Sequence, residues 1–488
     1  MKSHEHIFVL LLSFLFQLNL LAQTTPPPAP FGPVPSPIQL KWQEMEYYGF
    51  IHFNMNTFTN KEWGDGKENP KLFNPKKLDC NQWARTMKDA GMKGVIITAK
   101  HHDGFCLWPS KYTDHSVKYS PFRKGKGDVL KELSAACKKY GLKFGVYLSP
   151  WDRHDPNYGD SLKYNEIFKN ELREVLTSYG DIFEVWFDGA NGEGPNGKKQ
   201  VYDWQGINNV VRECQPNAVI FSDGGPDVRW VGDEDGYAGE TNWSLLRRDE
   251  VYPGYPKYLE LVSGHPNGTH WVPAECDVSI RPGWYYHPDQ DSMVKSLKTL
   301  IDIYFNSVGH NGSMLLNVPA DRNGLIPQID ARRLHEFKKY LEAAFANNLF
   351  RNAADTASAV RGNDPVYGSS ATIDSLQDTY WSTDDTTLTG SIEFTFNAPT
   401  LLNCLMIQEY IPLGQRVEQF TVEQFYDDEW EEVASGTTIG HERLVRFPTI
   451  QTSKLRLNII KSRACPAISS MGAYLIPKPG APPMRVEY

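Results

Sequence analysis

An apolar run at residues 183–187 (FEVWF) ends abruptly in a carboxylate, Asp188, which a glycine follows. A run of this kind predicts a strand that is buried on both faces. In barrel and open-sheet enzymes, the reacting groups lie just beyond the carboxyl ends of such strands. Asp188 is therefore a candidate catalytic residue, although an Asp-Gly pair can also do no more than begin a turn.

Polar and aromatic side chains follow the other strand-like runs in the same way. In chain order they are His52, Asn54, Glu62, Trp63, His101, His102, Asp103, Tyr147, Ser149, Trp151, Asp152, Trp186, Asp223, Arg229, Trp230, Glu234, Glu240, Glu275, Asp277, Arg281 and Trp284. Such a set suits a neutral ligand rich in hydroxyl groups, because indoles cover an apolar ring face while polar groups bind hydroxyls. It suits phosphate poorly, since fixed cations are few. Trp151 and Trp284 can equally belong to a core. For Asp223 and Asp277, capping of a helix or turn is favoured over a chemical role.

His101 and His102, with Asp103 beside them, could also begin a metal site. Adjacent residues on an extended chain point to opposite sides, however, so they seldom bind one ion. No Cys-x-x-Cys pair occurs among the seven cysteines. We therefore expect no metal ion and no other cofactor, and interpret the two imidazoles as hydrogen-bonding groups for sugar hydroxyls.

Glycoside hydrolysis needs two carboxyl groups that flank the scissile bond. One, with a raised pKa, protonates the departing oxygen, and the other attacks the anomeric carbon or activates water. Asp188 suits the role of nucleophile because it would lie at the floor of the pocket, on a rigid strand end. Glu234, Glu240 and Glu275 are all candidates for the acid, and spacing alone does not choose among them.

Seven strand-like runs alternate with amphipathic segments between residues 38 and 348. The runs cover residues 48–53, 94–99, 143–148, 183–187, 218–222, 270–274 and 313–318. This alternation predicts an α/β fold with a parallel sheet, most simply an irregular (β/α)8-like barrel. An open doubly wound sheet is the alternative, although no Gly-x-Gly-x-x-Gly turn follows the first run. Residues 349–488 hold short alternating runs separated by Asp, Asn, Gly and Pro, which predict an all-β sandwich.

The amino-terminal residues carry targeting signals. Residues 1–22 have Lys2 near the start, then an apolar segment, and are typical of a secretory signal peptide cleaved after Ala22. Residues 23–37 are rich in proline and predict an extended leader outside the fold. No later segment qualifies as a membrane span, so we expect an exported protein, periplasmic or extracellular. The net charge of −9, without a long basic run, argues against nucleic acid as a partner.

Several of these segments, taken in order, resemble the α-L-fucosidases of glycoside hydrolase family 29. They are residues 49–53 (GFIHF), 62–63 (EW), 100–105 (KHHDGF), 145–149 (GVYLS) and 186–189 (WFDG). Residues 229–234 (RWVGDE), 274–284 (AECDVSIRPGW) and 315–324 (LLNVPADRNG) resemble the branch that prefers α-1,3- and α-1,4-linked fucose. Residues 378–384 (DTYWSTD) resemble the discoidin-type sandwiches that occur behind such catalytic domains.

The resemblance implies a retaining double displacement with Asp188 as the nucleophile. It puts the acid/base shortly after the Arg-Trp-x-Gly segment, which matches Glu234; Glu275 is the second choice and Glu240 the third. It also implies that the following side chains contact fucose: His52, Glu62, Trp63, His101, His102, Tyr147, Trp186, Trp284 and, by a weaker match, Arg229.

We therefore predict a secreted, retaining exo-α-L-fucosidase that removes terminal α-1,3- or α-1,4-linked fucose from oligosaccharides or glycoconjugates. Two alternatives are an α-L-fucosidase of broader linkage range and a carbohydrate-binding protein whose barrel no longer catalyses. Asp188 together with several candidate acids argues against the second, since a decayed site usually loses one of them. The C-terminal sandwich could bind sugar or only contact the barrel.

Overall fold

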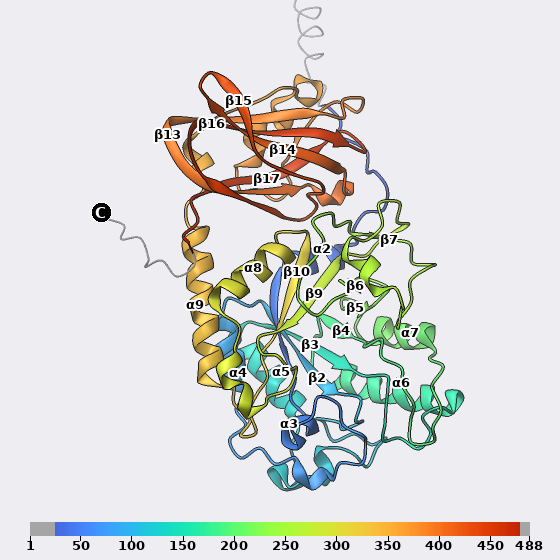
Figure 1. Ribbon diagram of the computed structural model, residues 1–488. Coiled ribbons are helices and arrows are strands. Elements are labelled where there is room, and N and C mark those ends of the chain that lie inside the picture. Colours follow the sequence, from blue (N-terminus) through green and yellow to red (C-terminus); the bar gives the residue numbers. More distant parts are fainter. Residues whose placement is uncertain (1–24, 479–488) are drawn as a thin grey trace, which may run out of the picture.

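The computed structural model describes residues 25–478, which form two domains (Figure 1). A barrel of parallel strands surrounded by helices extends to the end of helix α9 (Gln328–Ala344), and a domain of antiparallel strands follows. The signal peptide predicted for residues 1–22 lies outside the described residues. None of the helices in the described part of the chain is long and apolar enough to span a membrane.

Eight parallel strands close the barrel, which confirms the predicted α/β fold class. In chain order they are β1 (Tyr47–Ile51), β2 (Gly94–Lys100), β3 (Lys143–Leu148), β4 (Glu184–Trp186), β5 (Val219–Ser222), β6 (Val228–Trp230), β9 (Ala274–Ser279) and β10 (Gly312–Asn317). Each strand pairs with the next in this order, and β10 closes the ring on β1, where Leu315 lies opposite Tyr48.

β6 is a barrel strand that the sequence pattern did not predict. It has three residues and follows β5 after a short turn, with no helix between them. The prediction of a barrel strand at residues 270–274 is wrong. His270 and Trp271 form β8, which pairs with β7 (Leu245–Leu246) in a separate small sheet. The chain enters the barrel only at Ala274.

Helices cover the outside of the barrel (Figure 1). They are α4 (Cys80–Asp89), α5 (Val129–Tyr140), α6 (Ser161–Ser178), α7 (Trp204–Cys214), α8 (Leu297–Ser307) and α9. Each of the first four begins after an Asp whose carboxylate accepts backbone N–H groups of the first turn, the preferred N-cap arrangement. Their apolar faces meet the outer faces of the strands in one large core.

The barrel interior is filled with side chains rather than open. Aromatic residues dominate it, among them Tyr48, Phe50, Tyr147, Trp186 and Phe221. The short helix α2 (Pro37–Gln43) contributes Trp42 to the same cluster. In the described part of the barrel, space for a ligand therefore lies beyond the carboxyl ends of the strands, as in other barrels of this type.

The C-terminal domain is an all-β sandwich, which confirms the second half of the predicted fold class. Its strands are β11 (Ala354–Ala357), β12 (Trp381–Ser382), β13 (Gly390–Glu409), β14 (Val417–Tyr426), β15 (Glu429–Gly436), β16 (Arg443–Ser462) and β17 (Ala467–Tyr474). The two longest, β13 and β16, pair antiparallel with bulges. They enclose a core that includes Trp381, Phe394 and Leu457.

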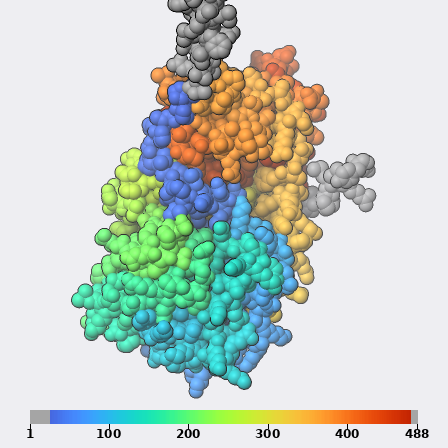
Figure 2. Space-filling model, turned by 180° about the vertical axis from the view of Figure 1, so that it is seen from behind, coloured from blue at the N-terminus to red at the C-terminus, as the bar shows by residue number. Residues whose placement is uncertain are grey.

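The proline-rich leader belongs to the fold, which corrects the prediction for residues 23–37. Its described residues run without helix or strand to Ser36 and lie along the surface of the sandwich (blue in Figure 2). Arg361 Nε donates to the Pro26 carbonyl (2.7 Å) and Arg416 Nη2 to the Ala29 carbonyl (2.7 Å). Proline lacks a backbone N–H but keeps its carbonyl as an acceptor, so the two buried arginines can bind the leader. The Phe31 N–H also donates to the Leu413 carbonyl (3.0 Å).

Candidate active site

A pocket of about 430 Å³ opens at the carboxyl ends of the barrel strands, within the size range of ligand pockets. The predicted residues that line it are Asp188, Glu234, His52, Trp63, His101, His102, Tyr147, Trp186 and Trp284. Three further strand-end residues named from the sequence also line it: Asp223, Trp230 and Asp277. The rest of the lining is Phe50, Gly189, Ala190, Gly254, Tyr255, Pro256 and Tyr258. Glu62, Arg229, Glu240 and Glu275 were predicted but do not line it. Residues 25–478 contain no cluster of His, Cys, Asp and Glu suited to a metal ion.

Asp188 is held firmly just beyond the end of β4. Its Oδ2 accepts a hydrogen bond from the Tyr147 hydroxyl (2.9 Å), and its Oδ1 accepts one from the Ala190 N–H (2.7 Å). A Cβ at Gly189 would lie 2.2 Å from Asp223 Oδ2, so the glycine lets two strand ends approach each other. The Asp188 side chain still keeps about a quarter of its surface exposed (24%). Asp188 is thus fixed and reachable, as a nucleophile must be.

His102 presents a hydrogen-bond acceptor beside Asp188. The Ser149 hydroxyl donates to the Trp151 carbonyl (2.8 Å) and therefore accepts from His102 Nδ1 (2.7 Å). Burial lowers the pKa of His102, so the ring is neutral and its Nε2 carries a lone pair. That Nε2 lies 3.7 Å from Asp188 Oδ2. Two neighbouring acceptors favour a ligand that brings hydroxyl donors.

His52 is oriented in the same way by Asn317, at the end of β10. Its Nδ1 donates to Asn317 Oδ1 (2.9 Å), because the Asn317 amide nitrogen donates to Ser279 Oγ (2.9 Å) and to the Trp284 carbonyl (2.8 Å). Burial lowers the pKa of His52 to about 3. His101 stands between the two imidazoles, and its Nδ1 is buried without a partner among the described residues. The three rings are therefore neutral hydrogen-bonding groups.

Glu234 lies beyond β6 and faces the same pocket as Asp188. Burial raises its pKa, and the negative charge of Asp188 raises it further, although a hydrogen bond from Trp284 acts in the opposite direction. In that bond the indole Nε1 donates to Glu234 Oε2 (3.1 Å). A carboxyl group with a raised pKa, held beside a second carboxylate, has the properties of a general acid.

Glu62 contacts the segment that carries the pocket residue Trp284. Its Oε2 accepts the Trp284 backbone N–H (2.9 Å), and its Oε1 contacts His287 Nε2 (2.5 Å). Since Trp284 donates to Glu234, Glu62 fixes the segment that orients the candidate acid. The contact of Glu62 with fucose stays a prediction: in the structure its carboxyl group contacts Trp284 and His287, and its side chain keeps 39% of its surface exposed.

Glu275 lies inside the barrel, which corrects its assignment as a candidate acid. It is fully buried and accepts hydrogen bonds from Trp186 Nε1 (2.7 Å) and from the Tyr48 hydroxyl. The Glu184 carboxyl lies beside it, with Oε2 bonded to Trp42 Nε1 (2.9 Å) and Oε1 without a donor among the described residues. Burial, and then the negative charge of Glu275, raises the pKa of Glu184 well above its usual range. One proton shared between the two carboxyls supplies the missing donor.

This shared proton predicts a measurable pH dependence of stability. The folded pair keeps a proton that the glutamates of the unfolded chain release above a pH of about 4.3. The free energy of unfolding therefore falls as the pH rises from that value toward the raised pKa of the folded pair. The slope is at most about 1.4 kcal/mol per pH unit. In Glu184→Gln the amide replaces the proton. We expect the variant to gain stability relative to wild type between pH 5 and pH 8, measured by urea unfolding. An exposed control, Glu342→Gln, should show no such trend; equal pH slopes in all three proteins would contradict the shared proton.

Glu240 and Arg229 point away from the pocket, which corrects both assignments. The Glu240 side chain is two-thirds exposed and faces Arg443 of the sandwich (3.7 Å). Arg229 is fully buried, and its guanidinium donates to the carbonyls of Leu261 (3.2 Å) and Val272 (2.7 Å). It therefore ties barrel loops together instead of contacting a ligand.

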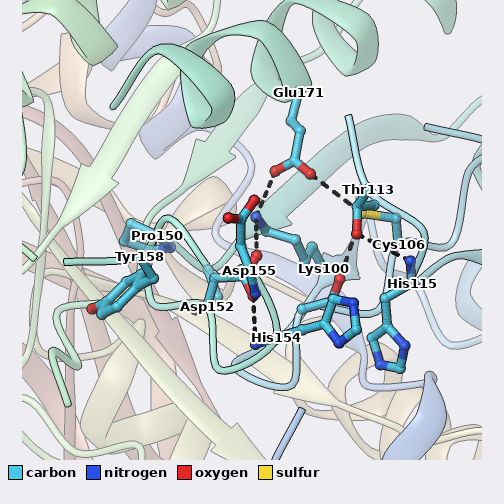
Figure 3. Close-up of polar contacts among 12 residues, drawn as sticks. Lys100, Cys106, Thr113, His115, Pro150, Asp152, His154, Asp155, Tyr158 and Glu171 are labelled. Carbon is cyan, nitrogen blue, oxygen red and sulfur yellow. Dashed lines mark hydrogen bonds and ion pairs between the residues drawn. The ribbon is translucent and has the colours of Figure 1, made fainter. Parts of the chain in front are cut away.

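A buried ion cluster behind the pocket anchors the loop after β3 (Figure 3). Lys100, at the end of β2, lies between Asp152 Oδ2 (3.2 Å) and Glu171 Oε2 (2.5 Å). Asp152 Oδ1 in turn accepts two backbone N–H groups of its own loop. That loop carries Ser149, which orients His102. A buried cation needs such partners because an unpaired buried charge is costly.

Two parts of the site were not singled out from the sequence. Asn317 was missed although it ends a strand at the same edge of the barrel as Asp188. Residues 254–258 were missed because they belong to no strand. The tyrosines of the segment 252–258 (YPGYPKY) were the available signal, since three aromatic residues in a polar loop are unusual for pure solvent exposure.

Known proteins match both domains. Residues 32–344 match the alpha-L-fucosidase family, and residues 354–471 match the F5/8 type C domain. Alpha-L-fucosidase 1 of Arabidopsis thaliana is 45% identical over 481 residues, which cover 96% of this chain and 94% of the plant protein.

Two solved structures extend the likeness. The crystal structure of a glycoside hydrolase 29 family member from an unknown rumen bacterium has 44% identity and a TM-score of 0.81, covering 92% of this chain and 78% of its own. A Ruminococcus gnavus GH29 fucosidase in complex with fucose has 32% identity and a TM-score of 0.85, covering 93% and 98%. With the family matched over most of the barrel, and relatives that span nearly the whole chain, this protein belongs to the α-L-fucosidases of glycoside hydrolase family 29.

Proposed function

We propose that the protein is a secreted, retaining exo-α-L-fucosidase that removes terminal α-1,3- or α-1,4-linked fucose from branched glycans. The observation that carries the proposal is the pair Asp188 and Glu234, which face one pocket in different surroundings. Asp188 is fixed by two donors, whereas burial and a neighbouring carboxylate raise the pKa of Glu234. Retaining hydrolysis needs this division between a nucleophile and an acid.

In the first step, an Asp188 oxygen attacks the anomeric carbon of fucose and the bond to the leaving sugar breaks. The proton of Glu234 passes to the departing oxygen. In the second step, Glu234 takes a proton from water, the hydroxyl attacks the same carbon, and the bond to Asp188 breaks. Each displacement inverts the anomeric centre, so the product keeps the configuration of the substrate.

The neutral imidazoles complete the fucose site in this proposal. His52 and His102 are each fixed through Nδ1, which leaves Nε2 free to accept a hydrogen bond from a fucose hydroxyl. Trp186 and Trp284 offer apolar surface for the C5 methyl group. No fixed cation lines the pocket among the described residues, which suits a neutral sugar better than an anionic ligand.

The linkage preference and the export are the finer parts of the proposal. The preference rests on the resemblance of residues 229–234 and 274–284 to one branch of the family, and a broader linkage range is the alternative. Export, to the periplasm or the extracellular space, rests on residues 1–22. Sequencing the amino terminus of the mature protein tests it, with Gln23 expected as the first residue.

The activity itself is tested by fucose release. We expect the enzyme to release fucose from trisaccharides with α-1,3- or α-1,4-linked branches faster than from α-1,2-linked ones. Proton NMR of the first turnovers should show α-fucose; initial β-fucose would exclude the retaining mechanism. Equal rates on all linkages would favour the broader alternative. Binding without release from any fucoside would favour a carbohydrate-binding protein.

A further inference from the structure

His154, in the loop after β3, has an oxygen acceptor at each of its two ring nitrogens. Its Nδ1 lies 2.7 Å from the Gly66 carbonyl oxygen, and its Nε2 lies 2.7 Å from Asp114 Oδ1. A carbonyl oxygen can only accept a hydrogen bond, and the Asp114 side chain, 80% exposed, is an ionised acceptor at neutral pH. A neutral imidazole carries one N–H, so only the imidazolium ion donates to both oxygens.

The groups that face His154 favour this charged form. Burial opposes the charge, but the hydrogen bonds to Asp114 and Gly66, together with the negative charge of Asp152, raise the pKa of His154 above its usual value. The ring stacks on that of His115 with centroids 4.3 Å apart (Figure 3). Burial lowers the pKa of His115 to about 4, so this neighbour is neutral and does not repel the imidazolium.

The Gly66 carbonyl belongs to the loop that brings Trp63 into the pocket. Trp63 lines the pocket although 54% of its surface is exposed. Its ring meets the rings of His102 and Trp151 edge to face, with centroids 5.3 Å and 5.5 Å away. A side chain this exposed has few packing partners, so the position of its indole depends on the backbone that follows it.

That backbone lies directly against the loop after β3. Gly66 has φ +79°, and a Cβ there would come within 2.2 Å of the Arg153 carbonyl oxygen. Arg153 Nη1 donates to the Gly64 carbonyl (2.5 Å), and Glu68 accepts the Gly66 N–H (2.9 Å). His154 adds a further contact between the two loops, and its strength depends on whether the ring is protonated.

From this arrangement we infer that His154, as an imidazolium ion, is a positioning residue that holds the Trp63 indole at the fucose site. The inference rests on the proposed fucosidase function and extends it to a residue outside the pocket lining. Below the raised pKa of His154 the cation is present, and its contribution to fucose affinity is complete. As the pH rises through that pKa, the ring keeps one donor, one of the two hydrogen bonds is lost, and the affinity falls.

The affinity for L-fucose, measured by isothermal titration calorimetry, tests this role without relying on turnover. His154→Gln is neutral at every pH. We expect it to bind fucose roughly threefold to tenfold more weakly than wild type at pH 6, the effect of one lost hydrogen bond. The difference should shrink toward pH 9, where His154 of the wild type is neutral as well. On fucosides the loss should appear in KM rather than in kcat, because it concerns binding.

Asp114→Asn keeps the imidazole and tests its charge. Without the carboxylate at Nε2, the pH at which fucose affinity falls should move down by about one unit. Asp65→Asn is the matched control, because Asp65 lies beside Gly66 but bonds the Lys67 N–H rather than His154. It should leave that pH unchanged. Equal shifts in both variants, no shift in Asp114→Asn, or wild-type affinity in His154→Gln at pH 6 would overturn the role.

A double substitution shows whether His154 acts through Trp63. Trp63→Ala should bind fucose more weakly, and adding His154→Gln should weaken binding no further. A further loss in the double variant would mean that His154 affects the site by another route, and would overturn its role in positioning Trp63. A wild-type enzyme that neither binds L-fucose at any pH nor releases it from fucosides would instead refute the proposed function.

Discussion

Replacing Asp188 with alanine is expected to lower kcat on fucosides by at least about 10⁴-fold, because removal of a covalent nucleophile leaves only binding and the acid. The fold should survive, since the carboxyl group is partly exposed and its two donors can bind water instead. Added azide should restore turnover by attacking the anomeric carbon directly. One displacement inverts that centre, so the product should be β-fucosyl azide.

The matched control is Asp223→Ala, which removes another carboxyl from the same pocket. Asp223 holds the Gly254 loop but does not face the anomeric carbon in the proposed mechanism. We expect a loss below about 100-fold and no azide product. Labelling of wild type with a 2-fluoro fucosyl fluoride should modify Asp188. A label on Asp223, or full activity in Asp188→Ala, would remove Asp188 from its role.

The alternation of side chains along a strand explains which of the candidate residues line the pocket. In β9, Glu275 and Asp277 both point inward, but Asp277 lies nearer the carboxyl end and reaches the pocket. Glu275 lies one layer below, against Trp186. The same layers occur at β4: Glu184 lies deepest in the barrel, Trp186 lies above it, and Asp188 lines the pocket beyond the strand end. A sequence motif identifies the residues of such a strand, but only the register of the strands in the barrel shows which of these residues line the pocket.

Arg229 shows the same limit at a single position. Adjacent residues of a strand face opposite sides, so Trp230 lines the pocket and Arg229 points outward to loop carbonyls. The sequence could not reveal this, because β6 is too short to display alternation. Asp188 was predictable for the opposite reason: a continuous apolar run precedes it and marks both the strand and its end.

Glu62, which the sequence pointed to, and Asn317, which it did not, both contact other parts of the protein around the pocket. Glu62 holds the backbone of Trp284, and Asn317 holds His52 and the Trp284 carbonyl. Such contacts join segments far apart in the chain, and one sequence contains no trace of them. These contacts position the groups that touch the ligand, and catalysis requires that position to be accurate to within a fraction of an ångström.

Replacing Glu234 with alanine should cost about 10²- to 10⁴-fold in kcat/KM on a trisaccharide, the usual contribution of general acid–base catalysis. Fucosyl fluoride should enter the first step nearly as fast as in wild type, because fluoride departs without a proton. The intermediate on Asp188 would then accumulate. Azide should release it as α-fucosyl azide, since two displacements retain the configuration. Opposite anomers from the Asp188 and Glu234 variants would separate the two roles in one assay.

The pH profile provides an independent check on the acid. In the proposed mechanism Glu234 must be protonated in the first step, and its raised pKa would extend activity upward in pH. Wild-type kcat/KM on the trisaccharide should therefore fall as pH rises through that pKa, and Glu234→Ala should lose this alkaline limb. Glu275→Gln is the control, because Glu275 is buried beneath the pocket and should leave the limb in place. If the alkaline limb vanished in Glu275→Gln but persisted in Glu234→Ala, Glu275 rather than Glu234 would be the acid. Glu275 would then need a path for its proton from the barrel interior to the pocket, and the aromatic residues around Trp186 block such a path.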